Sequence, residues 1–305
     1  MNKFPEDIPS LAILINNGDR KALARAITMV ENEMNGSEAL LKQIQPKEIP
    51  VLGFTGPPGA GKSTLINAFL RHIIAMKKKA AVVAVDPTSP FNFGSLLADR
   101  IRMAEHFTNE NIFIRSIATR GSLGGLSEKI IEITDVLRAS DFDFIIIETV
   151  GVGQSEVEIA GLADTTIVIV VPESGDDIQA MKSGIMEIAD IFVVNKSDRD
   201  GAAALVNNLK KMLTNKHDSG WDVSVISTVA TADQGISELL EKILLHRGSE
   251  RFNEKKNFLL IEKIYQLARN YRMRGLGRED IRKRLENAKQ EPSFNLYRFI
   301  DQFKN

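Results

Sequence analysis

Nine consecutive residues combine three glycines with one lysine and two hydroxyl side chains, in the order GPPGAGKST over 56–64. The run matches G-x-x-x-x-G-K-[S/T] between a strand-like and a helix-like stretch, and its backbone N–H groups can surround phosphate oxygens. We expect Lys62 to bridge the β- and γ-phosphates, Ser63 to ligate Mg²⁺ and Thr64 to touch the α-phosphate. The phosphate-binding candidates are Gly56, Pro57, Pro58, Gly59, Ala60, Gly61, Lys62, Ser63 and Thr64.

The base of the nucleotide is indicated by VVNKSD over 193–198, where an N-K-x-D pattern ends an apolar run. The Asp198 carboxylate can accept hydrogen bonds from N1–H and N2–H of guanine. Asn195 can bond its O6/N7 edge, and the stem of Lys196 can cover the ring. Adenine has no such donors at these positions, so it would leave the carboxylate unpaired at a high cost. Downstream of a phosphate loop, the pattern predicts GTP rather than ATP.

A third guanine contact is expected from the loop STVAT over 227–231, which follows the last apolar run. The candidate donors are the backbone amides of Ser227, Thr228 and Val229. The indication rests on position in the chain, and an ordinary surface loop is the alternative reading.

Acidic residues follow two other apolar runs. Glu148 opens an acid-x-x-Gly pattern that ends at Gly151, in which the acid serves Mg²⁺, usually through water, and the glycine amide senses the γ-phosphate. Glutamate is one methylene longer than the more usual aspartate, so it could reach the ion or position a water. Asp86 ends the second apolar run near the same phosphates, or else caps a turn or helix. Asp99 is a further metal-side candidate, with a solvated surface charge as its alternative.

Hydrolysis of a bound nucleotide needs an oriented water, Mg²⁺ and positive charge on the γ-phosphoryl group. Lys62, Glu148 and Gly151 form the predicted catalytic set. Gln154 either orients the water or is a polar residue at a helix start. We expect slow intrinsic turnover that a partner stimulates. An arginine contribution is open among four residues, each of which is also a plausible surface charge: Arg100, Arg102, Arg115 and Arg120.

Seven short apolar runs must position these residues, and most of them lack polar alternation. Such runs are typical of parallel strands covered by helices on both faces. The predicted fold is therefore a doubly wound α/β domain with a mostly parallel sheet. The expected strands cover 49–56, 80–86, 111–118, 142–148, 165–171, 191–196 and 223–228. The expected helices cover 62–79, 94–108, 123–139, 176–187, 199–214 and 235–246.

Helical extensions flank this domain. We expect an N-terminal extension over 1–47, the P-loop GTPase domain over 48–250 and a C-terminal arm over 251–305. The first extension is amphipathic and either packs on the domain or offers a partner surface. The arm could pack within the chain, but a dimer contact between two copies is favoured. Its apolar residues are Leu260, Ile264, Leu267 and Tyr271, then, beyond Gly275 and Gly277, Phe294, Phe299, Ile300 and Phe303.

Composition narrows the function further. The chain has 305 residues, 43% of them hydrophobic, and a net charge of −1, so nothing general attracts nucleic acid or a membrane surface. Zero cysteines exclude disulfides and thiolate chemistry, and the four histidines form no pair with metal-ligand spacing. No signal-peptide pattern or apolar run of about 20 residues occurs. We therefore expect a cytoplasmic protein.

The combined motifs are more selective than the two nucleotide patterns alone. They are GFTGPPGAGKSTLI, VAVDPTSP, RMAEH, GSLGGL, ETVGVGQSE and DDIQAMKSGIMEIADIFVVNKSD. From about Ile49 to Gly235, and more loosely beyond, the chain resembles the methylmalonyl-CoA mutase-associated GTPases, the MeaB/ArgK type of SIMIBI-class P-loop GTPases. The resemblance implies GTP/GDP and Mg²⁺ as ligands and a homodimer formed through the C-terminal arm. It also implies a chaperone that protects and reactivates an adenosylcobalamin-dependent acyl-CoA mutase and assists its cofactor loading.

The same resemblance implies roles for single residues. Lys62 and Ser63 match the family's phosphate and Mg²⁺ residues. The stretch from Pro172 to Lys182 matches a loop that relays the nucleotide state to the mutase, with Gln179 and Lys182 as its signalling residues. The family's acidic metal-side residues correspond to Asp86, Asp99 and Glu148. Arg102 is a possible partner of the signalling residues in the relay loop. Two departures from the family pattern are Arg120 and Glu173.

Two rival functions share the fold or the naming of close relatives. One is a kinase or ATPase linked to arginine/ornithine transport, but the sequence shows no feature that binds a phosphate acceptor. The other is a nickel-type metal-delivery GTPase. That function would require a Cys/His metal site, but the sequence has no cysteine and no clustered histidines.

Overall fold

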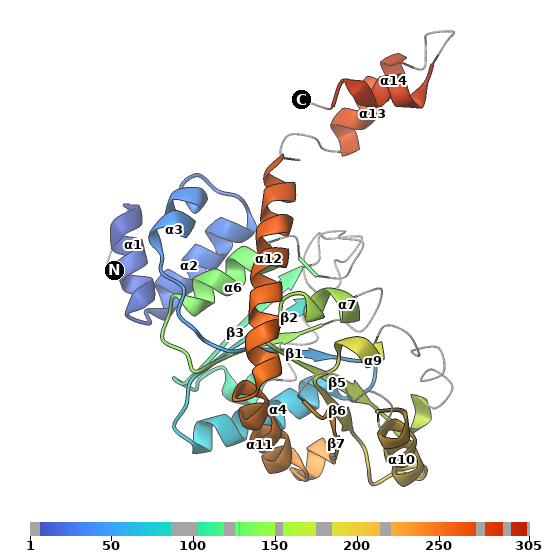
Figure 1. The fold of residues 1–305 in the computed structure, drawn as a ribbon. Coiled ribbons are helices and arrows are strands. Elements are labelled where there is room, and N and C mark those ends of the chain that lie inside the picture. Colours follow the sequence, from blue (N-terminus) through green and yellow to red (C-terminus); the bar gives the residue numbers. More distant parts are fainter. Residues whose placement is uncertain are drawn as a thin grey trace. The chain divides into compact units, whose positions relative to one another are not determined.

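The chain forms two compact units, Met1–Leu259 and Leu260–Asn305, in a computed structural model (Figure 1). The structure describes residues 7–86, 103–118, 126–127, 129–149, 155–174, 185–213, 221–272, 278–288 and 294–303.

One sheet of seven strands, all paired in parallel, organises the first unit in the order β3-β2-β4-β1-β5-β6-β7. All seven predicted strands and the predicted doubly wound fold are confirmed. β1, β4, β5 and β6 are buried at every position because helices cover both faces, which explains their unbroken apolar runs. The strands are β1 Val51–Thr55, β2 Ala80–Asp86, β3 Ile112–Ala118, β4 Phe144–Glu148, β5 Thr165–Val170, β6 Ile191–Val194 and β7 Ser224–Ser227.

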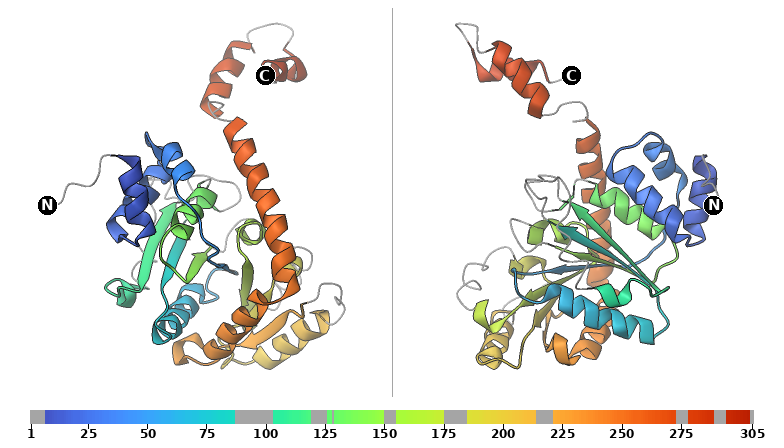
Figure 2. Two further views of the ribbon diagram at one scale, coloured as in Figure 1. Left: turned by 60° about the vertical axis from the view of Figure 1, so that its left-hand side comes forward. Right: turned by 180° about the vertical axis from the view of Figure 1, so that it is seen from behind.

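Helices cover the two faces of the sheet in two groups, as Figures 1 and 2 show. α4 (Lys62–Ala75) and α11 (Ile236–Arg247) pack on one face. The other face is covered by the N-terminal helices, α6 (Ile130–Arg138), α7 (Ser155–Ala160), α9 (Ile185–Ile188) and α10 (Ala202–Leu213). Parallel strands require such crossovers, and the carboxyl ends of the strands then share one edge.

Several helix boundaries differ from the sequence prediction. α4 ends at Ala75 rather than at 79, because Lys77 adopts a left-handed φ of 57° and Lys78 N–H bonds back to the Ile73 carbonyl. α7 was not predicted. Within the expected helix over 94–108, residues 94–102 lie outside the described residues, and a 3₁₀ helix, η1 (Ala104–His106), follows. Most of the expected helix over 176–187 also lies outside them.

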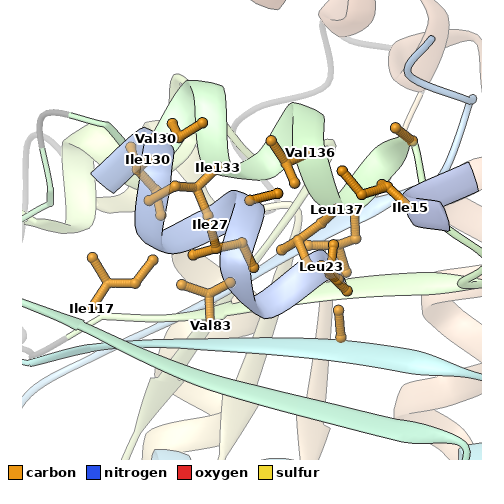
Figure 3. Close-up of a cluster of buried hydrophobic side chains, with 14 of the residues drawn as sticks. Ile15, Leu23, Ile27, Val30, Val83, Ile117, Ile130, Ile133, Val136 and Leu137 are labelled. Carbon is orange, nitrogen blue, oxygen red and sulfur yellow. The ribbon is translucent and has the colours of Figure 1, made fainter. Parts of the chain in front are cut away.

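The N-terminal segment shares the core of the sheet. Its three helices are α1 (Ile8–Asn16), α2 (Arg20–Glu31) and α3 (Ser37–Gln43), and Asp19 caps α2 by accepting from Ala22 N–H at 2.8 Å. Figure 3 shows Ile27 of α2 between the sheet residues Val83 and Ile117 and Ile133 of α6. All four side chains are at most 2% exposed in one hydrophobic cluster, so α2 packs on the domain.

The last part of the chain is helical. It begins with the long helix α12 (Glu250–Arg272), whose residues from Leu260 onward belong to the second unit. α13 (Arg278–Ala288) and α14 (Leu296–Asp301) follow, and Phe299 contacts Phe294 and Phe303 with ring centroids 5.8 and 5.5 Å away. Gly275 and Gly277 lie outside the described residues. Along α12, three residues of the predicted stripe are more than half exposed, namely Leu260, Ile264 and Tyr271. Across the described part of the chain, no helix has the length and apolarity needed to span a membrane.

Candidate nucleotide-binding site

The phosphate loop joins β1 to α4 at the carboxyl edge of the sheet. Gly56 and Gly61 have φ of 145° and 85°, a region that strains residues with a Cβ. A Cβ at Gly56 would lie 2.1 Å from the Ile169 carbonyl oxygen, and one at Gly61 would lie 2.5 Å from Asn195 Nδ2. These glycines therefore allow β5 and the N-K-x-D residues to approach the loop backbone.

The predicted phosphate lysine lies inside this loop. Lys62 is 7% exposed, and its ammonium group donates to the carbonyl oxygens of Gly56 at 2.8 Å and Pro57 at 3.1 Å. Lys62 is also the first residue of α4, whose N-cap Gly61 provides no capping side chain. A helix N-terminus beside a cation is well suited to bind an anion, because its backbone N–H groups point outward along the helix axis.

Ser63 and Glu148 meet although 85 positions separate them. The Ser63 hydroxyl donates to Glu148 Oε1 at 2.6 Å, and the two residues are 4% and 5% exposed. Glu148 ends β4, where it pairs with Phe54 of β1. The contact brings two oxygen donors together, and oxygen is the ligand type that Mg²⁺ prefers.

The other metal-side candidates are not placed by side chain. Asp86 ends β2 opposite Ala118 of β3, but only its backbone is described, and Asp99 lies outside the described residues. The described residues contain no group of three or more His, Cys, Asp or Glu side chains that could hold a metal. Among the described side chains, Ser63 and Glu148 are the predicted metal-side residues that lie together.

Two threonines that the sequence did not single out fasten the exit of β4. Thr149 N–H donates to the Phe54 carbonyl at 3.1 Å, and its hydroxyl lies 2.9 Å from that of Thr55. Both threonines directly follow or end a strand at this edge, which is the available sequence signal. They hold Glu148 beside the first turn of α4.

Asn195 joins three segments of the site. The side chain is 2% exposed, and its amide N–H donates to the Ala60 carbonyl at 2.9 Å. Its carbonyl oxygen accepts from the Thr228 hydroxyl at 3.1 Å and from Ala230 N–H at 3.3 Å. The side chain thus connects the phosphate loop with the loop after β7, a role that the sequence prediction of a guanine contact did not include.

The turn after Asn195 leaves Asp198 exposed. Lys196 adopts a φ of 55°, uncommon for a residue with a side chain, and Ser197 donates to the Thr228 carbonyl from both its N–H and its hydroxyl at 3.0 Å. Ser197 is a third residue, after the two threonines, that the sequence prediction missed. These bonds hold the turn against the loop after β7.

The loop after β7, which carries the predicted guanine donors, is folded tightly. Thr228 N–H donates to the Val194 carbonyl at 2.8 Å, and Val229 N–H donates to the Gln234 carbonyl at 3.2 Å. In this conformation both amides bond within the protein, and a guanine contact from this loop stays a prediction. Ser227 ends β7, opposite Val194 of β6.

Of the four candidate arginines, the structure describes Arg115 alone. It lies on β3, and its guanidinium donates to Glu31 at 2.9 Å and to the Thr28 hydroxyl at 3.1 Å, both on α2. This pairing ties Arg115 to the N-terminal layer, which favours a structural role for this residue over a catalytic one. The other three candidates, Arg100, Arg102 and Arg120, lie outside the described residues. The same is true of Gly151, Gln154, Gln179 and Lys182.

The start of the predicted relay loop contacts the base motif. Glu173, in η2 (Pro172–Ser174), forms an ion pair with Arg199, the residue after Asp198. The hydrogen bond from Arg199 lowers the pKa of the Glu173 carboxyl below its ordinary value. Glu173, at the start of the predicted relay loop, is therefore joined to the turn that follows the N-K-x-D motif.

Comparisons with known proteins agree with this geometry. The family model for methylmalonyl-CoA mutase-associated GTPase MeaB matches residues 23–289. A Pyrococcus abyssi protein named as a GTPase is 46% identical over 267 residues, which cover 84% of this chain and 82% of the relative. The GTPase ArgK of Escherichia coli is 38% identical over 242 residues, which cover 75% of this chain and 73% of that protein.

Two further relatives extend the comparison. The mouse protein named methylmalonic aciduria type A homolog, mitochondrial, is 36% identical over 245 residues, which cover 73% of this chain and 59% of that protein. A solved structure described as a LAO/AO transport system kinase has a TM-score of 0.73 and 28% sequence identity, and the alignment covers 99% of this chain and 98% of that one. The chain belongs to the MeaB family of methylmalonyl-CoA mutase-associated GTPases.

Proposed function

We propose that this chain binds and hydrolyses GTP and uses the nucleotide state to assist an adenosylcobalamin-dependent acyl-CoA mutase in cofactor loading and reactivation. The observation that carries the nucleotide part is the bonding of Asn195 to both Ala60 and Thr228, which fixes a base motif to a phosphate loop. Family membership supports the mutase part. The chain acts as a homodimer in the cytoplasm under this proposal.

The phosphate side of the site would work through positioning and charge. Lys62 would exchange its two carbonyl contacts for the β- and γ-phosphates, and the N-terminus of α4 would add N–H donors. Ser63 and Glu148 fit Mg²⁺, because both place an oxygen at one buried position. Bound Mg²⁺ would neutralise negative charge on the phosphate oxygens. Glu148 would orient the Ser63 hydroxyl toward it.

The base side of the site would supply specificity. The exposed Asp198 carboxylate would accept N1–H and N2–H of guanine, and the stem of Lys196 would cover the ring. Ser197 holds this turn in place through Thr228, which keeps Asp198 at a fixed distance from the phosphate loop. GTP and GDP are thus the proposed ligands.

Segments that begin at fixed points would report the nucleotide state. The loop with Gly151 starts just after Thr149, which is bonded to β1, and the stretch from Pro172 to Lys182 starts beside the Glu173–Arg199 ion pair. Asp86 and Asp99 are proposed on the metal side of the same switch. The extension over 1–47 and the arm over 251–305 would flank the GTPase domain, with the arm joining two copies.

Complex formation with methylmalonyl-CoA mutase tests the proposal. The purified chain, the mutase and either GDP or a non-hydrolysable GTP analogue are mixed, and the complex is measured by size-exclusion chromatography with light scattering. We expect the amount of complex to differ between the two nucleotides, and Lys62→Ala to abolish the difference and GTP turnover. Equal complex formation in every nucleotide state would reject the mutase part. Labelled phosphate transfer to a periplasmic binding protein would instead favour the kinase reading.

A further inference from the structure

Charged side chains on α4 contact both the loop after β7 and the helix η1. Arg71 lies 3.2 Å from Asp233 Oδ1 through one nitrogen and 3.1 Å from Glu105 Oε1 through the other. His72 Nε2 lies 2.9 Å from Asp233 Oδ2. Both oxygens of the Asp233 carboxylate are therefore engaged by neighbouring residues of one helix.

Asp233 occupies a demanding position in its loop. Its φ is 60°, a left-handed conformation that Asp and Asn tolerate better than most residues. The next residue, Gln234, exchanges two backbone hydrogen bonds of 3.2 Å with Val229, and these bonds close the loop. Burial acts to raise the pKa of the Asp233 carboxyl, but the hydrogen bonds from His72 and Arg71 outweigh it and keep that pKa below its ordinary value.

α4 connects this loop to the phosphate residues. It begins with Lys62 and Ser63 and reaches Arg71 about two and a half turns later, at 3.6 residues per turn. A helix that short is stiff, so an anchor on its second half fixes the loop after β7 relative to the phosphate loop. Asn67 adds a 2.7 Å bond to Glu105, which belongs to the same cluster.

We propose that Asp233, held by Arg71 and His72, is a positioning residue that sets the loop after β7 at the correct distance from the phosphate loop for guanine recognition. The inference rests on the proposed function and on the contacts by which this loop holds Asn195, the predicted contact of the guanine O6/N7 edge. A simple surface ion pair is the competing account, since the side chains of Arg71 and Asp233 are 42% and 45% exposed. The two accounts differ in what happens at O6.

Measuring the binding of two nucleotides distinguishes the positioning role from a simple surface ion pair. The dissociation constants of GDP and 6-thioguanosine diphosphate are measured by calorimetry; the second nucleotide has a weak acceptor in place of O6 and keeps the other base contacts. We expect the unaltered protein to prefer GDP. Asp233→Gly keeps the left-handed backbone accessible but removes the carboxylate. It is expected to weaken GDP binding about two- to fivefold and to change 6-thioguanosine diphosphate binding by less than about twofold.

Two further variants guard against misfolding and indirect effects. Arg71→Met removes the charge from α4 and is expected to reduce the preference for GDP as Asp233→Gly does. Asp233→Asn keeps the shape of the side chain and is expected to retain an intermediate preference. Asp141→Asn is the matched control, because it breaks a similarly exposed pair with Lys79 at the amino ends of β2 and β4. It is expected to leave both nucleotides unaffected.

The outcomes distinguish the inference from the proposed function. Parallel weakening of both nucleotides in the Asp233 and Arg71 variants, or no change in either, would overturn the positioning role. Equal affinity of the unaltered protein for the two nucleotides would overturn it as well. Failure of the unaltered protein to bind either one would instead reject the guanine site itself.

Discussion

A single short hydrogen bond between Ser63 and Glu148 joins the phosphate loop to the end of β4. Glutamate suits this position because its extra methylene spans from the strand to the first turn of α4. Its carboxylate then faces the hydroxyl that would hold Mg²⁺. The site requires both the length and the charge of the Glu148 side chain, and two substitutions can test these requirements one at a time.

Glu148→Gln keeps the length of the side chain and removes its charge. We expect Mg²⁺-dependent GTP turnover to fall about 10- to 100-fold, as is usual when the partner of a metal ligand is altered. GDP binding without Mg²⁺ should stay close to that of the unaltered protein. Glu148→Asp should be similarly impaired, because the shorter carboxylate loses Ser63. Turnover measured against Mg²⁺ concentration checks this, and an unchanged rate in both variants would remove Glu148 from the metal side.

Asp198→Asn tests the identity of the base. The amide donates where the carboxylate accepts, so it complements the C2 carbonyl of xanthine and leaves guanine mismatched. We expect GTP affinity to fall about 100-fold or more and xanthosine triphosphate to bind better than GTP. Competition binding with the two nucleotides measures the switch. GTP affinity equal to that of the unaltered protein would exclude Asp198 from the base site.

At this scale, the residues with recognisable chemistry could be predicted and their supports could not. Lys62, Ser63 and Glu148 belong to local motifs, so their place at one edge follows from strand order. The bonds of Thr149 and Asn195 join segments far apart in the sequence. No local sequence pattern predicts hydrogen bonds between such distant segments. The same reason explains why the bonds of the amides after β7 to Val194 and Gln234 could not be predicted.

At the scale of elements, a buried polar cluster fastens α11 and α12 to the amino ends of two strands. Asp190, fully buried before β6, accepts from Thr166 N–H at 2.8 Å and from Lys255 of α12 at 2.5 Å. His246 of α11 is also fully buried and lies 2.9 Å from the Thr165 hydroxyl. Burial lowers the pKa of His246 to about 4, despite the opposing effect of Asp190.

This shift predicts how stability depends on pH. The unfolded chain protonates His246 near its ordinary pKa of 6.5, whereas the folded protein resists protonation until about pH 4. The unfolded state therefore binds more protons in this window, and the contribution of His246 to stability is lost as the pH falls from about 6.5 to about 4. We expect the free energy of unfolding to drop by on the order of 3 kcal/mol from this group.

His246→Asn provides the check. The shorter amide can keep a bond to Thr165 and does not titrate, so the free energy of unfolding should depend less on pH in that window. Urea denaturation at several pH values measures it. His72→Asn is a control, since His72 lies 22% exposed on α4 outside this cluster. A pH profile identical to that of the unaltered protein would contradict the assignment to His246.

The elements themselves could be predicted well where apolar runs are continuous. All seven strands follow from such runs, because fully covered parallel strands need no polar residues. Helix ends depend on single residues, such as the left-handed Lys77 that ends α4 early. A short helix such as α7 has too few turns for a periodic pattern.

At the scale of the whole molecule, the exposed apolar face of α12 supports the proposed dimer. Leu260 and Ile264 are one turn apart and are 55% and 58% exposed in the single chain. We expect the double substitution Leu260→Glu and Ile264→Glu to give a monomer that binds GDP like the unaltered protein. Sedimentation velocity measures the state. Leu244→Glu, at a position 45% exposed on α11, is the control that should remain dimeric. An unaltered protein that is already monomeric would contradict the proposed dimer.

The central claim is that guanine-nucleotide state governs assistance to a mutase, and reactivation of inactivated methylmalonyl-CoA mutase by the Asp198→Asn variant tests it most directly. Mutase activity is followed after adding adenosylcobalamin, the variant and either GTP or xanthosine triphosphate. The account predicts recovery with xanthosine triphosphate and little with GTP, the reverse of the unaltered protein. Recovery that is the same with either nucleotide, or absent with both proteins, would contradict it.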